Sequence, residues 1–261
     1  MTDPFRTHVG AHVPVAELFH ENSKLPARVN DAGGSPFGQY HGAGRAGNGE
    51  SKTYRTAEKT SLPPLSHLGE PISDVLGRRR SIRSYEPDSV TLWQVSQLFG
   101  WSYGIIPRPG EGSGSGRSAP SGGGLYPIEL YVAAQRVAGL RPAVYHYSPA
   151  AHCLETVATD GAIEAVRRAS LYPEIVGEAN LYLIMVAVFA RTCAKYGERG
   201  YRFVLLDCGH VAQNLHLVGT AIGLGSVGIG GFLDDRLNDV LELDGVNEAV
   251  VHTIALGQMR Q

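Results

Sequence analysis

The chain has 261 residues, of which 43% are hydrophobic and 18% are charged, so it carries enough apolar side chains for one large core or two small domains. This composition excludes a disordered or fibrous protein. The 23 Lys and Arg residues against 25 Asp and Glu residues give a formal net charge of -2, which lacks the positive excess that drives binding to nucleic acid, so we expect no nucleic-acid partner.

The N-terminal quarter of the sequence differs in amino-acid composition from the rest. Its first ten residues lack the basic and apolar regions of a signal peptide, and the longest apolar run of the chain, Leu181 to Ala190, is far shorter than a membrane span. We therefore expect a cytoplasmic protein with no membrane partner. The segment from Lys24 to Leu62 is rich in Gly, Ser and polar residues, which predicts either a flexible arm, cut first by proteases between Ala32 and Lys52, or an extended wrap. Residues 1–64 are thus a partly flexible N-terminal extension, and residues 65–261 form the folded domain.

Two helices are predicted at the start of this domain. Glu70 to Arg80 has Pro71 in its first turn and arginines at its end, where cations complement the helix dipole. Thr91 to Trp101 places its apolar residues on one face, which is typical of a helix that packs on a core.

Strands are predicted in the middle of the chain. A glycine-rich stretch from Gly110 to Gly124 leads into the β-rich run Ile128 to Arg136. Ala143 to Tyr147 and Cys153 to Val157 are predicted to form a hairpin around Ser148-Pro149.

The C-terminal half alternates helices and apolar strands. Leu181 to Phe189 is hydrophobic without interruption, which predicts a strand buried on both faces, and Tyr201 to Ile222 is predicted to be the longest helix, of about five to six turns. The remaining predicted elements are a helix at Gly161–Ser170, a strand at Ser226–Phe232, a helix at Asp235–Leu241 and a strand at Val250–Leu256. This order predicts an α+β fold with a largely buried mixed sheet.

Several familiar motifs are absent or stand in the wrong context. Gly223-Leu-Gly225-Ser-Val-Gly228 matches GxGxxG, but a predicted helix precedes the glycines and a strand follows them, the reverse of the order that places a phosphate at a helix N-terminus. These glycines fit a helix C-cap and a tight strand entry. No serine lies in a GxSxG frame. Cys153, Cys193 and Cys208 are too widely spaced for a disulfide framework or a zinc site, so no metal is expected.

Two polar clusters are the strongest indications of a functional site. The arginine box, Arg78-Arg79-Arg80-Ser81-Ile82-Arg83, groups guanidinium groups with a hydroxyl and can bind a phosphate through charge-assisted hydrogen bonds; the alternative is a solvated basic helix end. The turn Ser118-Ala-Pro-Ser-Gly-Gly-Gly124-Leu-Tyr126-Pro127 would let a flat ligand approach the backbone. Its alternative is an ordinary flexible loop.

With Gly228-Ile-Gly230-Gly231-Phe232-Leu-Asp234-Asp235 and the closing His252-Thr-Ile-Ala-Leu-Gly257, these clusters resemble the flavin-dependent nitroreductase superfamily over most of the chain. The runs SAPSGGGLYPIELYV and KYGERGYRFVLLDCGHVAQNL are similar to its SagB-type dehydrogenases, which oxidise peptide thiazolines and oxazolines to thiazoles and oxazoles. The resemblance implies a nitroreductase-like mixed β-sheet flanked by helices, an intertwined homodimer, and an FMN-binding catalytic domain over residues 65–261.

The resemblance also implies four groups of residues that hold FMN. The arginine box would hold the phosphate and ribityl chain, and the proline, serine and first glycine of the turn would line the flavin from the partner subunit. Two glycines would present backbone N–H groups near flavin N5, and a C-terminal arginine would replace the basic tail with which family members often continue. In that order the residues are Arg79, Arg80, Ser81 and Arg83; Pro120, Ser121 and Gly122; Gly230 and Gly231; and Arg260.

The catalytic base is assigned to Lys195 or Tyr196, which match the Lys-Tyr pair of the SagB branch. Conversion of an azoline to an azole removes a proton from one ring carbon and a hydride from its neighbour, so the site combines a base with a hydride acceptor, flavin N5. A nearby ammonium favours the phenolate, while a desolvated lysine can itself be a neutral base. The alternative is that Lys195 is solvated and Tyr196 only packs ahead of the long helix.

The predicted function is therefore an FMN-dependent oxidase of azoline rings in peptide or carrier-protein-bound intermediates, acting beside a cyclodehydratase-type partner. Two alternatives stay open: an NAD(P)H-dependent nitro or quinone reductase, and a non-catalytic flavin-binding subunit of a biosynthetic complex. Asp207, His210 and Asn214 share one face of the long predicted helix. If buried they need partners, which a dimer seam, a flavin edge or the core can supply.

Overall fold

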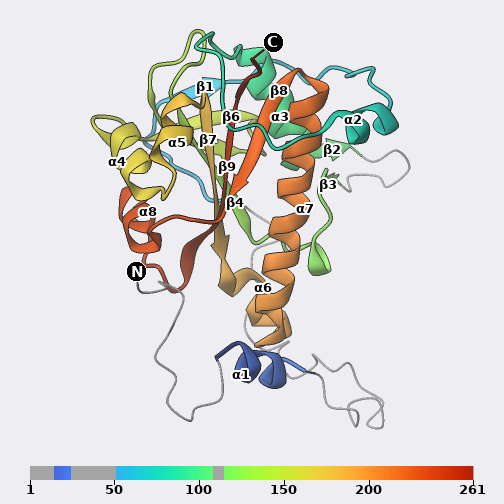
Figure 1. The fold of residues 1–261 in the computed structure, drawn as a ribbon. Coiled ribbons are helices and arrows are strands. Elements are labelled where there is room, and N and C mark those ends of the chain that lie inside the picture. Colours follow the sequence, from blue (N-terminus) through green and yellow to red (C-terminus); the bar gives the residue numbers. More distant parts are fainter. Residues whose placement is uncertain (1–14, 25–50, 108–114, 261) are drawn as a thin grey trace.

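A seven-stranded sheet with helices on both faces forms the centre of the protein (Figure 1). The computed structural model describes residues 15–24, 51–107 and 115–260. Every strand of this sheet pairs antiparallel with its neighbours. In order across the sheet, the strands are β1 (Lys59–Ser61), β6 (Cys153–Ala158), β5 (Ala143–Ser148), β4 (Ile128–Ala134), β7 (Leu181–Val188), β9 (Glu248–Gln258) and β8 (Leu224–Ile229).

The strand directions differ from the prediction, while the α+β class is confirmed. The sequence predicts a mixed sheet, but among the described residues parallel geometry occurs in two isolated bridges, Ser81 with Ser226 and Val90 with Val137. The first lies on the edge of β8 that β9 leaves free. At the opposite edge, β1 pairs with β6, so the sheet already includes residues ahead of position 65. Most of the predicted flexible arm, residues 25–50, lies outside the described residues.

Helices cover both faces of the sheet (Figure 1). Three lie on one face, three on the other, and two lie near the N-terminal end of the longest helix. In that order they are α2 (Ile72–Arg78), α3 (Leu92–Tyr103) and α7 (Arg199–Ala221); α4 (Ala162–Ala169), α5 (Pro173–Glu178) and α8 (Asp234–Val240); and α6 (Phe189–Tyr196) and α1 (Val15–Asn22). A small hairpin, β2 (Ile105–Pro107) with β3 (Ser115–Arg117), and a 3-10 turn at Gly122–Gly124 complete the described elements. None of the helices in the described ranges is long and apolar enough to span a lipid bilayer.

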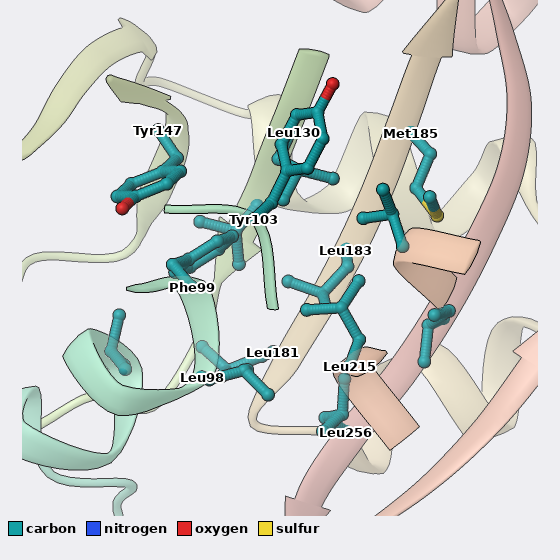
Figure 2. Close-up of a cluster of buried hydrophobic side chains, with 14 of the residues drawn as sticks. Leu98, Phe99, Tyr103, Leu130, Tyr147, Leu181, Leu183, Met185, Leu215 and Leu256 are labelled. Carbon is teal, nitrogen blue, oxygen red and sulfur yellow. The ribbon is translucent and has the colours of Figure 1, made fainter. Parts of the chain in front are cut away.

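The central strands β4 and β7 bury both of their faces, as the uninterrupted hydrophobicity of β7 predicts. Leu183 and Met185 of β7 lie in a core with Phe99 of α3 and Leu215 of α7 (Figure 2). The intervening residue, Ile184, lies in a second core under α4, α5 and α8. Because side chains alternate between the faces of a strand, a strand that is apolar at every position is favoured only where both faces are covered.

Helix α7 follows the prediction closely, whereas α6 does not appear in it. The long helix begins at Arg199, two residues ahead of the predicted start. Directly before it, the eight residues of α6 end at Tyr196, and the positive φ of 57° at the next residue, Gly197, breaks the helix. Lys195 and Tyr196 therefore occupy the last turn of a helix of their own, and α6 packs against the start of α7.

Candidate active site

Lys195 and Tyr196 lie against the glycine turn, although more than seventy residues of sequence separate them from it. A β-carbon placed on Gly123 would stand 2.5 Å from the Tyr196 hydroxyl oxygen and 2.9 Å from Lys195 Nζ. Gly123 also has a positive φ of 68°, so two independent constraints, the backbone conformation and the space, favour glycine there. The Lys195 ammonium lies 5.3 Å from the centre of the Tyr196 ring. The two candidates for the base thus share one small space.

The glycine loop (residues 121–126) is held from one side by Asp207 of α7. The Ser121 hydroxyl donates to one carboxylate oxygen at 2.5 Å, and the Gly122 N–H donates to the other at 3.3 Å. The Tyr126 N–H in turn donates to Ser121 Oγ at 2.8 Å. Burial raises the pKa of the Asp207 carboxyl above its usual value, and the two donated hydrogen bonds partly oppose that rise. Asp207 therefore has its partners within one chain.

The other members of the predicted polar face have different surroundings. Asn214 donates from its side-chain nitrogen to the Ser102 carbonyl at 3.1 Å, and His210 is exposed. The three side chains of this face therefore do not share one kind of surroundings. Asp207 and Asn214 are satisfied by hydrogen bonds within the chain, and His210 faces outward.

Arg191 of α6 holds the loop from its other end. Its guanidinium donates to the Tyr126 carbonyl at 3.1 Å and to the Glu129 carboxylate at 2.5 Å. Tyr126 has a φ of 47°, a left-handed conformation that is rare for a bulky residue and persists only where its surroundings enforce it. Because Arg191 is four residues before Lys195, the same helix face anchors the loop and carries the ammonium.

A buried ionic network stands behind Arg191. Glu129, with a side chain 1% exposed, also accepts from the ring of His146 at 2.8 Å, and the other ring nitrogen of His146 lies 3.0 Å from the Glu155 carboxylate. Burial alone would raise the pKa of Glu129, but the hydrogen bond from His146 and the charge of Arg191 outweigh it and hold that pKa below its usual value. Neither Arg191 nor Glu129 was predicted as a site residue. A lone carboxylate in the otherwise uncharged strand β4 is the signal that could have found them.

The arginine box lies at the opposite end of α7. Ile82 donates its N–H to the Ser226 carbonyl at 3.0 Å, which fixes the box to the free edge of β8 beside the Ser81 bridge. Arg79 is half-buried, and its positive charge helps to lower the pKa of His216 of α7. Arg83 is exposed.

Two further predicted arginines have partners within the chain. Arg80 donates to the Gly77 and Arg79 carbonyls, each at 2.8 Å, and faces a cavity of about 320 Å³ that Arg78 and Thr220 also line. Arg260 lies 3.5 Å from Glu178 in an exposed ion pair. Of the predicted arginines, Arg79, Arg80 and Arg83 make no ion pair among the described residues.

The glycines after β8 leave the sheet edge open. Gly230 is exposed, and a β-carbon there would meet no heavy atom within 4 Å. Gly231 differs, because its carbonyl accepts from Leu171 and a β-carbon would stand 3.0 Å from the Tyr172 ring. The backbone at Gly230 is thus exposed, while Gly231 is packed from one side.

Within one chain, the two clusters stand apart. The first cluster is the glycine loop, where Ser121 and Gly122 are bound to Asp207 and Pro120 is exposed. The second is the cavity beside Arg80, which Thr220 lines. Asp207 and Thr220 are thirteen positions apart on α7, which corresponds to about 20 Å along the helix axis. Among the described residues, no group of three or more His, Cys, Asp or Glu side chains is placed to hold a metal ion.

The chain is similar in sequence to known proteins along most of its length. A family model described as "Nitroreductase family" matches residues 76–258. A nitroreductase-like protein of Methanocaldococcus jannaschii is 34% identical over 182 residues, which cover 70% of this chain and 88% of that protein. The Microcin B17-processing protein McbC of Escherichia coli is 35% identical over 135 residues, which cover 49% of each.

Solved structures share the fold. A nitroreductase-like protein from Anabaena variabilis matches with a TM-score of 0.73 and 25% identity, over 97% of this chain and 49% of that one. A chain of the Escherichia coli microcin synthetase McbBCD complex, with truncated pro-MccB17 bound, matches with a TM-score of 0.61 and 24% identity, over 95% and 92%. A nitroreductase-like protein in complex with FMN from Desulfovibrio desulfuricans matches with a TM-score of 0.52 and 20% identity, over 74% and 88%. The chain thus spans about half the length of McbC and of the Anabaena chain.

Proposed function

This chain belongs to the nitroreductase family, and we propose that it is a SagB-type, FMN-dependent oxidase that converts thiazoline or oxazoline rings in peptide or carrier-bound intermediates to azoles. The observation that carries the proposal is the meeting of Lys195 Nζ and the Tyr196 hydroxyl at Gly123. A reductase fed by a nicotinamide needs no base at this point, whereas azoline oxidation does. The similarity to McbC, a protein named for processing microcin B17, supports the same assignment.

The residues at the free edge of β8 fit FMN. Gly230 leaves room for a flat ring, and Arg79, half-buried and without an ion pair in the described part of the chain, fits a phosphate. We assign Arg79, Ser81 and Arg83 to the phosphate and ribityl chain, and Gly230 and Gly231 to the ring. When bound, FMN supplies a hydride acceptor.

The remaining predicted FMN ligands would have to change partners to join this site. Arg80 would leave the Gly77 and Arg79 carbonyls. Arg260 would leave Glu178. Both exchanges cost little stability, because the two side chains are exposed, where water replaces a lost hydrogen bond or ion pair.

The proposed site is built across a homodimer. The base lies near the N-terminal end of α7 and the arginine box near its C-terminal end, and Asp207 and Thr220, which mark the two clusters, are about 20 Å apart along the helix axis. A second copy packed antiparallel along α7 would therefore bring the base of one chain to the box of the other. Pro120, Ser121 and Gly122 would reach the flavin from that second copy. Helix α7 carries a suitable apolar surface, because Leu205 and Leu206 are 43% and 59% exposed.

The base acts within the space between α6 and the glycine loop. Lys195 or Tyr196 takes the proton from one ring carbon of the azoline, while the hydride leaves the neighbouring carbon, so that the ring gains its second double bond. Arg191 and Asp207 keep the loop and α6 in register through Tyr126 and Ser121. The peptide or carrier segment would be delivered by a cyclodehydratase-type partner, in line with the likeness in fold to a chain of the McbBCD complex.

The test is anaerobic mixing of the purified yellow protein with an azoline peptide or with NADPH, followed by the flavin absorbance. Bleaching by the azoline peptide, with formation of azole, supports the proposal. Bleaching by NADPH alone identifies a nitro or quinone reductase. If neither the azoline peptide nor NADPH bleaches the yellow protein, it is the non-catalytic flavin-binding subunit. A colourless protein that binds no added FMN overturns the flavin assignment itself.

A further inference from the structure

Two histidines flank Gly228 at the exposed edge of β8. A β-carbon on Gly228 would stand 3.2 Å from His252 Nε2 and 3.7 Å from His216 Nε2. His252 comes from β9 and His216 from α7, so three elements bring the two rings to one point. Gly228 is itself exposed, which means that the space between the rings opens to the surface. A side chain at this position would fill that space.

The orientation of the pair leaves its Nε2 atoms available. His216 Nδ1 lies 2.7 Å from Ser226 Oγ, which fixes that ring with Nε2 toward Gly228. The ring of His252 makes no hydrogen bond to any residue in the described part of the chain. Burial lowers the pKa of both histidines, that of His216 to about 4 with help from His252 and Arg79. At neutral pH both rings are uncharged, and each can exchange hydrogen bonds with a hydroxyl group.

The pair lies between the two ends of the proposed flavin site. Ser226 meets the arginine box at one end, and Gly230 leaves room for the ring at the other. At about 3.3 Å per residue, the four steps from Ser226 to Gly230 span about 13 Å. Gly228 is the midpoint of that span. In a bound FMN, the ribityl chain, which joins the phosphate to the ring and carries hydroxyl groups, would lie over Gly228.

We infer that His216 and His252 bind the ribityl hydroxyls of FMN above Gly228. The inference rests on the proposed flavin site and adds two residues to it that the arginine box and the glycines do not include. It also assigns a reason for glycine at position 228, because the chain of hydroxyls needs the space that a β-carbon would take.

Three flavins that differ only in what is attached to the ring separate this role from others. FMN has ribityl and phosphate, riboflavin has ribityl alone, and lumiflavin has neither. Dissociation constants are measured by flavin fluorescence on the full-length, flavin-free chain and its variants. His216→Leu and His252→Leu should each weaken FMN and riboflavin binding by roughly 3- to 10-fold, the effect of one hydrogen bond, and leave lumiflavin within twofold. Arg79→Ala should weaken FMN alone.

Two variants control for folding and for chemistry. His67→Leu, at an exposed histidine outside the pair, should bind all three flavins normally. His252→Gln keeps a hydrogen-bonding side chain and should retain most of the riboflavin affinity. Equal losses for lumiflavin and riboflavin, or unchanged riboflavin binding in both leucine variants, would overturn the inference while the flavin site stands. A wild-type chain that binds none of the three flavins would overturn both.

Discussion

The two ends of α7 are built differently. At its N-terminal end, the glycine loop is held by hydrogen bonds from Asp207 and Arg191, and the network behind it is buried. At its C-terminal end, the arginine box meets β8 through a backbone bridge, and a β-carbon on Gly230 would meet no heavy atom within 4 Å. At the first end the polar groups are paired within the chain, whereas at the second end Arg79 and Arg83 make no ion pair among the described residues.

This difference matches the two tasks that the proposed reaction sets. A base must be positioned closely, because proton transfer requires hydrogen-bond contact with the ring carbon. A cofactor site can complete its hydrogen bonds when the cofactor binds, and it needs an open approach until then. We therefore expect substitutions at the first end to change rate and stability, and substitutions at the second end to change flavin affinity.

The largest effect is expected for Lys195→Ala and Tyr196→Phe. If they supply the base, each should lower azole formation by roughly two to four orders of magnitude, with FMN retained, because neither is assigned to the cofactor. Product formation and flavin content are measured together. Reduction of the flavin by a chemical donor should barely change, since that route takes no proton from a ring carbon. Near-normal azoline oxidation in both variants, or loss of flavin, would remove them from this role.

Mixing a base variant with a phosphate-site variant, at an FMN concentration too low to load the phosphate-site variant alone, then tests whether the ends of α7 meet across the dimer. A Lys195→Ala chain and an Arg79→Ala chain each lack one half of the site. After subunit exchange, a mixed dimer contains one site with both halves intact, so part of the activity and flavin retention should return. If the mixture stays as inactive as its components, the two clusters do not combine between chains.

The next largest effect is expected for Arg191→Ala. This variant leaves the buried Glu129 without its guanidinium, and removal of one partner from a buried ion pair costs about 3 to 5 kcal/mol. The free energy of unfolding is measured by chemical denaturation. Arg167→Ala is the matched control, because Arg167 pairs with Glu164 at the surface, where an ion pair contributes little, so its loss should be much the smaller of the two. Equal losses in the two variants would show that the network behind the loop does not stabilise the fold.

At the other end of α7, Arg79→Ala and Ser81→Ala should weaken FMN retention without changing the fold. Loss of one charge-assisted hydrogen bond to a phosphate corresponds to roughly 10- to 100-fold in affinity, and loss of a neutral one to less. Flavin content after gel filtration and the FMN dissociation constant report both. Unchanged occupancy in the two variants would place the phosphate elsewhere.

How far the sequence could predict this comparison depends on the range of each interaction. The strand Leu181–Val188 and the helix Arg199–Ala221 were predictable because continuous burial and helical periodicity leave long patterns. The eight-residue helix Phe189–Tyr196 leaves no such pattern. The assignment of Lys195 and Tyr196 came from resemblance to a family.

The meeting of that pair with Gly123 is a tertiary contact that no local pattern records. The same holds for Arg191 with Glu129, which are 62 positions apart. It also holds for the histidines, because His216 and His252 belong to a helix and a strand that are adjacent only in the folded sheet. What the sequence could supply at these positions was the residue type, and the contacts followed from the fold.

The smallest effect concerns the pH dependence of stability at the C-terminal end of α7. His216 has a folded-state pKa of about 4, lowered by burial and by the charges of His252 and Arg79, whereas an unfolded histidine titrates near about 6.5. Below about pH 6.5 the histidine therefore binds a proton in the unfolded chain but stays neutral in the folded chain. The contribution of His216 to the free energy of unfolding is thus present in full above this pH and is lost as the pH falls toward 4. Between pH 7 and pH 5, this loss is on the order of 1 to 2 kcal/mol. His216→Asn removes the titrating group, so its free energy of unfolding, measured without flavin, should fall less over this interval than that of the wild type. His67→Asn, at an exposed site, should follow the wild type. A His216→Asn chain that loses as much stability as the wild type would show that His216 is not held neutral by its surroundings.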